Sequence, residues 1–225
     1  MTIQKNISII IISFSSFLFS EPFSEFKVNK IYSMPFTTME PNIDGILDDS
    51  IWVDVPSIDD FSQLEPNLFE PPSYRTSVKI VHDNNYLYIA AQMLDDNPDN
   101  ISAQLCRKDD WMTCFEKTSD WISIALDSFH DHKSGYVFVV NAAGVQVDAM
   151  IYDDSDYDGD WNAIWLSQIN IHDHGWNVEM KIPISTFPFN KGMDWGLNIT
   201  RYIHYLNEED SWGVLPRYLN SIASK

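Results

Sequence analysis

A run of alternating carboxylates is the densest chemical feature of the sequence. Its members are Asp154, Asp156, Asp158 and Asp160, with a glycine before the last. Oxygen ligands at alternate positions with a glycine for a sharp turn are typical of loops that wrap a hard cation such as Ca²⁺. An EF-hand would also need a glutamate at its twelfth position, where Trp165 stands. We therefore expect these four carboxylates to bind structural calcium, with an acidic, solvated turn as the alternative.

The sequence offers few residue patterns that are typical of catalysis. It has no serine nucleophile elbow, no phosphate-binding glycine loop and no Cys–His arrangement. A glycosidase needs two carboxylates about 5 to 9.5 Å apart. With 33 acidic residues, some such pair will be close by chance. We therefore expect no catalytic residues, and hydrolysis of glycosidic bonds is the less favoured alternative.

Charge and composition exclude some partners. The 225 residues contain 14 Lys and Arg against 33 Asp and Glu, which gives a net charge of −19. Such a charge repels a polyanion, so nucleic acid is excluded as a partner. The hydrophobic content of 44% suits a folded domain. Two cysteines, Cys106 and Cys114, are too few for a disulfide scaffold; they either form one pair or stay as thiols.

The first 20 residues have the pattern of a secretory signal peptide. Lys5 precedes an apolar run that ends at the small Ser20. This run is shorter than the roughly 20 apolar residues that cross a bilayer as a helix. We therefore expect export to the periplasm, the outer membrane or the extracellular space. Residues 21–41 are expected to be an irregular linker, and residues 42–225 a single domain.

The elements that must position these side chains are predicted to be β-strands. From residue 74 onward, short β-branched and aromatic runs alternate with Asn, Asp and Gly clusters at roughly ten-residue spacing. This pattern predicts an all-β, antiparallel two-sheet sandwich, jelly-roll-like, with one short helix beginning near residue 48. The segment 95–119 has no clear period and is expected to be a long loop. The expected strands are 75–82, 86–94, 120–127, 136–142, 145–151, 164–171, 175–182 and 195–204, with a weaker one at 58–63.

Strand alternation predicts which side chains share a face. In 175–182, the apolar Trp176, Val178, Met180 and Ile182 are expected to point into the core. In 145–151 we expect the valines to point inward and Gln146 and Asp148 outward. Planar polar side chains beside aromatic rings suit a sugar, whose hydroxyls need donors and acceptors. Ordinary solvated strand faces are the alternative.

Several motifs together resemble a known family. Residues 43–52, IDGILDDSIW, resemble the opening I-D-G-x-L-D-x-x-x-W of family 9 carbohydrate-binding modules. The likeness extends over residues 40–225, and it is greatest to family 9-like domains that open exported bacterial proteins with a C-terminal outer-membrane β-barrel-like region. The further motifs, in the family's order, are VKIVHDNNYLYIA from residue 78, SDWISIALD from 119, YVFVVNAAG from 136, DWNAIW from 160, GWNVEMKIP from 175, Trp195-Gly196 and Arg201.

The resemblance implies a glycan partner held between two aromatic rings. By position, the first ring falls at Phe115 or the nearby Trp111, and the second at Trp212 or Tyr218. Where sugar-binding members carry an arginine, this chain has Val139. The hydrogen-bonding residues expected around the sugar are Asp120, Asn141 and Gln146.

The resemblance also implies structural calcium and a role accessory to glycan breakdown or uptake, beside a neighbouring glycosidase. The alternative is a structural or interaction domain of an outer-membrane barrel protein that binds no sugar.

Overall fold

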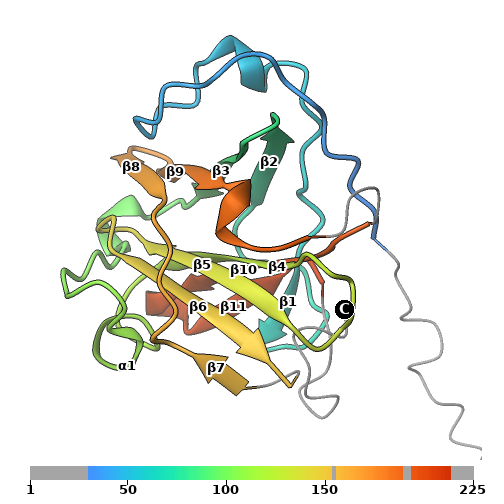
Figure 1. The fold of residues 1–225 in the computed structure, drawn as a ribbon. Coiled ribbons are helices and arrows are strands. Elements are labelled where there is room, and N and C mark those ends of the chain that lie inside the picture. The colour runs from blue at the N-terminus through green and yellow to red at the C-terminus, as the bar shows by residue number, and fades with distance from the viewer. Residues whose placement is uncertain (1–29, 154–155, 190–193, 214–225) are drawn as a thin grey trace, which may run out of the picture. The chain divides into compact units, whose positions relative to one another are not determined.

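The computed structural model describes residues 30–153, 156–189 and 194–213 (Figure 1). The described residues from Tyr32 onward form one compact unit. Its described strands make two sheets, of seven and four strands, in which every pairing is antiparallel. The predicted all-β sandwich is therefore confirmed. No helix among the described residues has the length and hydrophobicity needed to cross a membrane.

The seven-stranded sheet contains the first and the last of the described strands, β1 and β11. Its order is β1-β11-β10-β4-β5-β6-β7, so that β7 forms one edge. The short, polar strands β7 and β11 were not among the expected strands, because neither has an apolar alternation. The bounds are β1 (Ser62–Glu65), β11 (Glu208–Ser211), β10 (Gly196–Ile203), β4 (Trp121–Asp127), β5 (Gly135–Asn141), β6 (Gln146–Tyr152) and β7 (Asp156–Asp158).

The four-stranded sheet has the order β2-β3-β9-β8. Its bounds are β2 (Thr76–His82), β3 (Tyr86–Leu94), β9 (Gly175–Pro183) and β8 (Leu166–His172), close to the expected strands. Helical residues in the described ranges are single short turns. They are the 3-10 turns η1 (Ser50–Trp52), η2 (Pro98–Asn100), η3 (Ile184–Thr186) and η4 (His204–Leu206), and α1 (Trp111–Cys114) in the long loop.

The main core lies between the two sheets. The predicted inward residues of β9, from Trp176 to Ile182, are fully buried there. They pack with apolar residues of β2, β3, β4, β5 and β10, including Ile80, Ile124 and Phe138. The period-two pattern of the central strands therefore reports the core correctly, because one face of each sheet meets the other sheet.

The outer face of the four-stranded sheet is covered by the N-terminal segment (Figure 1). Ile51 and Trp52 pack there against Val81, Tyr88 and Ala90 in a second buried cluster. Residues 32–41, which we expected to be irregular, contain no helix or longer strand, but Phe36 forms an isolated bridge with β2. The part of this outer face around Val81, Tyr88 and Ala90 is thus shielded from water.

A buried carboxylate explains the opening motif. Glu179 of β9 is fully buried, and its Oε2 accepts hydrogen bonds from the backbone N–H groups of Asp44 and Gly45, each at 3.0 Å. Its Oε1 accepts a bond of 2.9 Å from the indole N–H of Trp52. Burial raises the pKa of Glu179, while these donors lower it. The Asp-Gly and Trp positions of the motif therefore all donate hydrogen bonds to one carboxylate of the sheet, that of Glu179.

The glycine of this motif is required by both conformation and space. Gly45 has a φ of +81°, which disfavours any side chain. A Cβ at this position would lie 2.6 Å from the carbonyl carbon of Ile169 in β8. The motif therefore serves to seat the N-terminal segment on the sheet.

The expected orientation of strand 145–151 is wrong. Asp148 pairs with Phe138, and cross-strand neighbours share a face, so Asp148 points toward the main core. It is fully buried; its Oδ1 accepts a bond from the N–H of Ala163, and its Oδ2 from the indole of Trp165. Val147 instead packs on the outer face of the sheet. The valines of this strand are apolar although they point to the outer face, because that face is covered as well. The hydrophobic pattern therefore predicted the wrong face as the core.

Candidate functional site

The long loop places its aromatic residues on the outer face of the seven-stranded sheet. Phe115 is fully buried, and its ring stacks on Trp111 with a centroid distance of 5.7 Å. Trp121 and Tyr202 stack beside them at 5.6 Å. Because Phe115 is enclosed by Trp121, Val139 and its other neighbours, it has no free face for a sugar in this conformation. Trp111 remains partly exposed.

Ionic contacts fasten this loop to β6. The ammonium of Lys108 lies 2.8 Å from Oδ2 of Asp148 and 3.2 Å from Oδ2 of Asp109. Burial lowers the pKa of Lys108, but the two carboxylates raise it above its ordinary value overall. Cys106, in the same loop, is disulfide-bonded. These contacts attach the loop, and with it the aromatic cluster, to the sheet.

The predicted second ring is also buried. Trp212 is 6% exposed, packs in the main core, and donates from its indole N–H to Oδ1 of Asp60 at 2.8 Å. Tyr218, its alternative, lies outside the described residues. The structure therefore does not bring Phe115 and Trp212 together as two open rings.

The three predicted polar contacts form internal hydrogen bonds. Asp120 is fully buried and accepts a bond from the N–H of Ser102. Asn141, also buried, accepts bonds from two backbone N–H groups of the β5–β6 turn. Gln146 is partly exposed, but its amide donates to the hydroxyl of Ser167. These contacts support the fold of the loops around them.

A buried charged group lies between the sheets. Arg201 is 1% exposed and donates to the carbonyl of Leu94. Burial raises the pKa of Asp120 to about 6, against the attraction of Arg201. Burial and the neighbouring Glu208 raise the pKa of Asp210 to about 8. All these side chains are at most 3% exposed, so we assign them to stability rather than to ligand binding.

The acidic run does not form a wrapped loop in its described part. Asp156 and Asp158 fall in β7, which pairs with β6 in an extended conformation. Oδ1 of Asp158 accepts a bond from the N–H of Asp160 at 3.0 Å. Asp154 lies outside the described residues. Within the described part of the chain no three His, Cys, Asp or Glu side chains are placed to hold a metal, and calcium binding stays a prediction.

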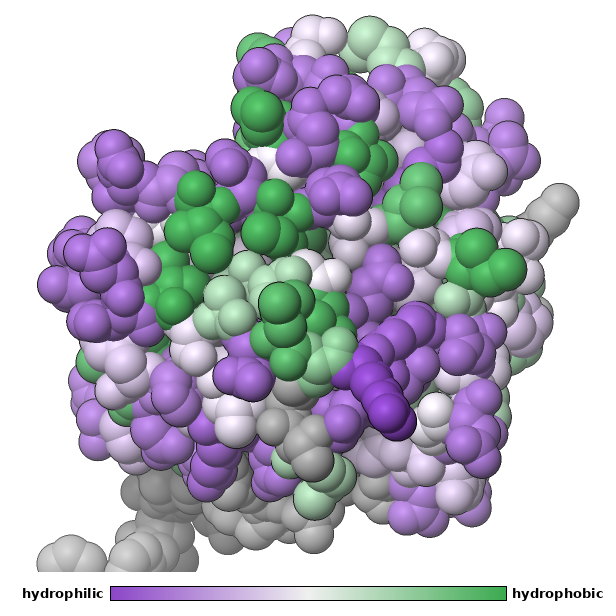
Figure 2. Space-filling model, turned by 90° about the vertical axis from the view of Figure 1, so that its left-hand side faces the viewer, coloured by the Kyte–Doolittle hydropathy of each residue, from purple (hydrophilic) through white to green (hydrophobic). Residues whose placement is uncertain are grey.

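Aliphatic side chains are exposed on the side of the molecule that carries α1 and β8 (Figure 2). The exposed residues in these two elements include Met112, Leu166 and Ile171, with exposed fractions of 74%, 57% and 43%. Such side chains lack the flat surface and polar groups that a sugar needs. This side is therefore a weak candidate for a sugar site.

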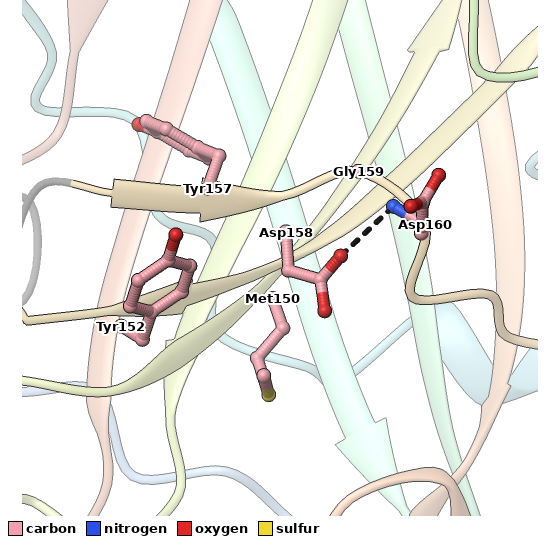
Figure 3. Close-up of a pocket in the computed structure, with 6 residues that line it drawn as sticks. All are labelled: Met150, Tyr152, Tyr157, Asp158, Gly159 and Asp160. Carbon is pink, nitrogen blue, oxygen red and sulfur yellow. Dashed lines mark hydrogen bonds between the residues drawn. The ribbon is translucent and has the colours of Figure 1, made fainter.

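An open pocket lies at the edge of the seven-stranded sheet, beside the acidic run. It has a volume of about 440 Å³ and is formed by β6, β7 and the residues that follow. Figure 3 shows Tyr152, Met150 and the Asp158 carboxylate on one side of β7 and the ring of Tyr157 on the other, in agreement with the pairing of Tyr157 with Ile151. The lining residues are Met150, Tyr152, Tyr157, Asp158, Gly159 and Asp160.

This pocket, which we call the tyrosine pocket, combines the groups that bind polar cyclic ligands. Tyr152 is 42% exposed and Tyr157 is 51% exposed, because β7 is an edge strand with no further strand to cover it. Burial and the charge of Glu209 raise the pKa of Tyr157, whose ring lies on the opposite face of the sheet from Tyr152. Asp158 and Asp160 supply acceptors. Sequence reasoning noticed the aspartates but missed the tyrosines that alternate with them.

The fold and this pocket define a β-sandwich binding module. The family described as carbohydrate family 9 binding domain-like matches residues 43–210, and the chain belongs to this family. It is a family of noncatalytic binding modules, so enzymatic activity is not supported. No match was found among curated proteins.

Solved structures agree on the fold. A family 9 carbohydrate-binding module from Caldicellulosiruptor kristjanssonii in complex with glucose has a TM-score of 0.58 and 18% identity, covering 86% of this chain and 91% of that one. A second structure of a family 9 module from this organism, with cellotriose, has a TM-score of 0.53 and 18% identity, with coverages of 80% and 82%. At this identity the likeness shows the fold alone.

Proposed function

We propose that this chain binds carbohydrate noncovalently and that the tyrosine pocket is the place where it does so. The observation that carries the proposal is the exposed ring of Tyr152 beside the carboxylates of Asp158 and Asp160 in a module of this family. Two similar structures hold glucose and cellotriose, which supports a pyranose as the ligand class.

The chemistry of the pocket fits a pyranose. The C–H face of the sugar lies against a tyrosine ring, which removes apolar surface from water. The sugar hydroxyls donate to the carboxylates of Asp158 and Asp160 and accept from the hydroxyl of Tyr152. Because the pocket is open to solvent, these contacts exchange with water and give weak, reversible binding.

Titration calorimetry with glucose and cello-oligosaccharides tests the proposal. The variant Tyr152→Ala removes the ring that lies beside the carboxylates and should weaken binding by about tenfold or more. Phe36→Ala, which truncates another exposed ring on the opposite sheet, is the matched control and should bind normally. Unchanged affinity in the tyrosine variant would show that the pocket is not the binding site. If the wild-type chain binds no sugar on a broad glycan array, the proposal of carbohydrate binding itself is contradicted.

We also propose that the protein is exported and acts as an accessory to glycan breakdown or uptake. The disulfide-bonded Cys106 supports an oxidising compartment, as does the signal-peptide pattern of residues 1–20, which lie outside the described part. Fractionation of cells that produce the chain, with and without residues 1–20, tests the export. An association with an outer-membrane barrel region is a separate hypothesis, to be tested by co-purification.

A further inference from the structure

We propose that His130 and His132, in the turn between β4 and β5, form a binding site for a divalent transition-metal ion such as Zn²⁺. They belong to the first of two His-Asp-His triplets in the sequence, at 130–132 and 172–174. Imidazole nitrogen is a preferred ligand of Zn²⁺ and Cu²⁺, whereas Ca²⁺ prefers oxygen. The proposal is independent of carbohydrate binding and of the calcium prediction for the acidic run.

The two rings lie close enough to share one ion. Their centroids are 4.7 Å apart, and their planes are nearly perpendicular, at 84°. With Zn–N bonds of about 2.0–2.1 Å and tetrahedral angles, two imidazoles on one ion have their centroids about 5 Å apart. Both side chains are exposed, so an ion reaches them from solvent and water completes its coordination shell.

A backbone carbonyl sets the tautomer of His130. The Nδ1 atom of this ring lies 3.1 Å from the carbonyl oxygen of Asp194, just before β10. Because a carbonyl oxygen only accepts, Nδ1 carries the proton, and Nε2 of the neutral ring keeps its lone pair. Histidines that bind metals are commonly oriented by such a hydrogen bond from their other ring nitrogen. His130 is therefore held as a ligand through Nε2.

The backbone of the turn is ordered by its own hydrogen bonds. The carboxylate of Asp127, at the end of β4, is buried and accepts from the N–H groups of Asp131 at 3.3 Å and of His132 at 2.9 Å. The carboxylate of Asp131 accepts from the next two backbone N–H groups. Since these bonds fix the turn that carries both rings, binding of an ion costs little further conformational entropy.

The second triplet is arranged differently. The ring centroids of His172 and His174 are 6.5 Å apart. Both nitrogens of His172 are engaged, since Nε2 lies 3.2 Å from the side-chain oxygen of Asn177 and Nδ1 accepts from the N–H of His174, also at 3.2 Å. A metal would have to break one of these bonds. The same three residue types therefore provide an internal control for the site at His130 and His132.

Titration calorimetry with ZnCl₂ tests the site on the full chain, produced without a histidine tag. The single variants His130→Asn and His132→Asn each remove one imidazole. Asparagine tolerates the left-handed φ of 53° and 56° at these positions, so the turn keeps its conformation. We expect each variant to bind Zn²⁺ about tenfold more weakly, or worse. The control His172→Asn/His174→Asn should bind as tightly as the wild-type chain.

Melting curves give a second measure of the same site. Zn²⁺ should raise the melting temperature of the wild-type chain and of the control by a similar amount, and that of His130→Asn by less. Excess Ca²⁺ should leave Zn²⁺ binding unchanged, and displacement of Zn²⁺ by Ca²⁺ would contradict the inference by assigning the ion to carboxylates. The inference is overturned if the wild-type chain shows no saturable Zn²⁺ binding, or if the control loses as much affinity as His130→Asn.

Discussion

Removal of the Glu179 carboxylate tests how the family motif holds the fold together. In Glu179→Ala, three buried donors lose their acceptor, namely the N–H groups of Asp44 and Gly45 and the indole N–H of Trp52. The segment that carries them covers the four-stranded sheet, and Trp52 packs there against Tyr88 and Ala90. We therefore expect the whole domain to lose stability, and not only its N-terminal segment.

The size of the effect follows from these contacts. An unsatisfied buried donor costs about 1–3 kcal/mol, so three donors give about 3–9 kcal/mol if nothing relaxes. Water that enters the space left by the side chain will satisfy some of them, and we expect about 3–5 kcal/mol. For a domain of this size each kcal/mol lowers the melting temperature by roughly 2–4 °C, which gives a decrease of about 6–20 °C.

Urea unfolding followed by tryptophan fluorescence measures this loss. Trp52 contributes to the signal and lies directly at the altered site. Glu116→Ala, which truncates an exposed glutamate of the long loop, is the control and should change stability by less than about 0.5 kcal/mol. A loss of under about 1 kcal/mol in Glu179→Ala would refute the reasoning, because it would mean that the three donors find water without cost.

Three further predictions concern the backbone, pH and calcium. Gly45→Ala should destabilise by about 2 kcal/mol or more in the same urea assay, because its Cβ meets the backbone of Ile169 at 2.6 Å and its φ is +81°. The pKa of Asp210 is raised by burial to about 8, so the folded state holds a proton that the unfolded state has lost above pH 4. The contribution of Asp210 to stability should therefore fall as pH rises from about 4 to 8, by at most about 1.4 kcal/mol per pH unit, and Asp210→Asn should reduce the fall of stability with pH in thermal unfolding at a series of pH values. If the acidic run binds calcium, adding Ca²⁺ after EDTA should raise the melting temperature, and Asp158→Asn should reduce that rise. A melting temperature that changes with neither EDTA nor Ca²⁺ would contradict the calcium prediction.

Much of the architecture is determined locally. The run 86–94 coincides with β3, and the alternation of Trp176, Val178 and Met180 identifies core residues, because a strand between two layers repeats every second residue. The motif at 43–52 was readable as a family feature, although its physical reason, the carboxylate of Glu179, lies more than 120 residues away in the chain.

The site was decided by tertiary packing. Alternation shows that Val147 and Asp148 point to opposite faces, but it does not say which face is the core when both are covered, and here Asp148 points inward. Phe115 and Trp212 have the composition of a binding platform, yet the loop and the sandwich bury them. Tyr152 and Tyr157 are exposed only because β7 ends the sheet. The sequence determined which side chains share a face; which rings reach water depends on contacts between distant segments, which local periodicity does not encode.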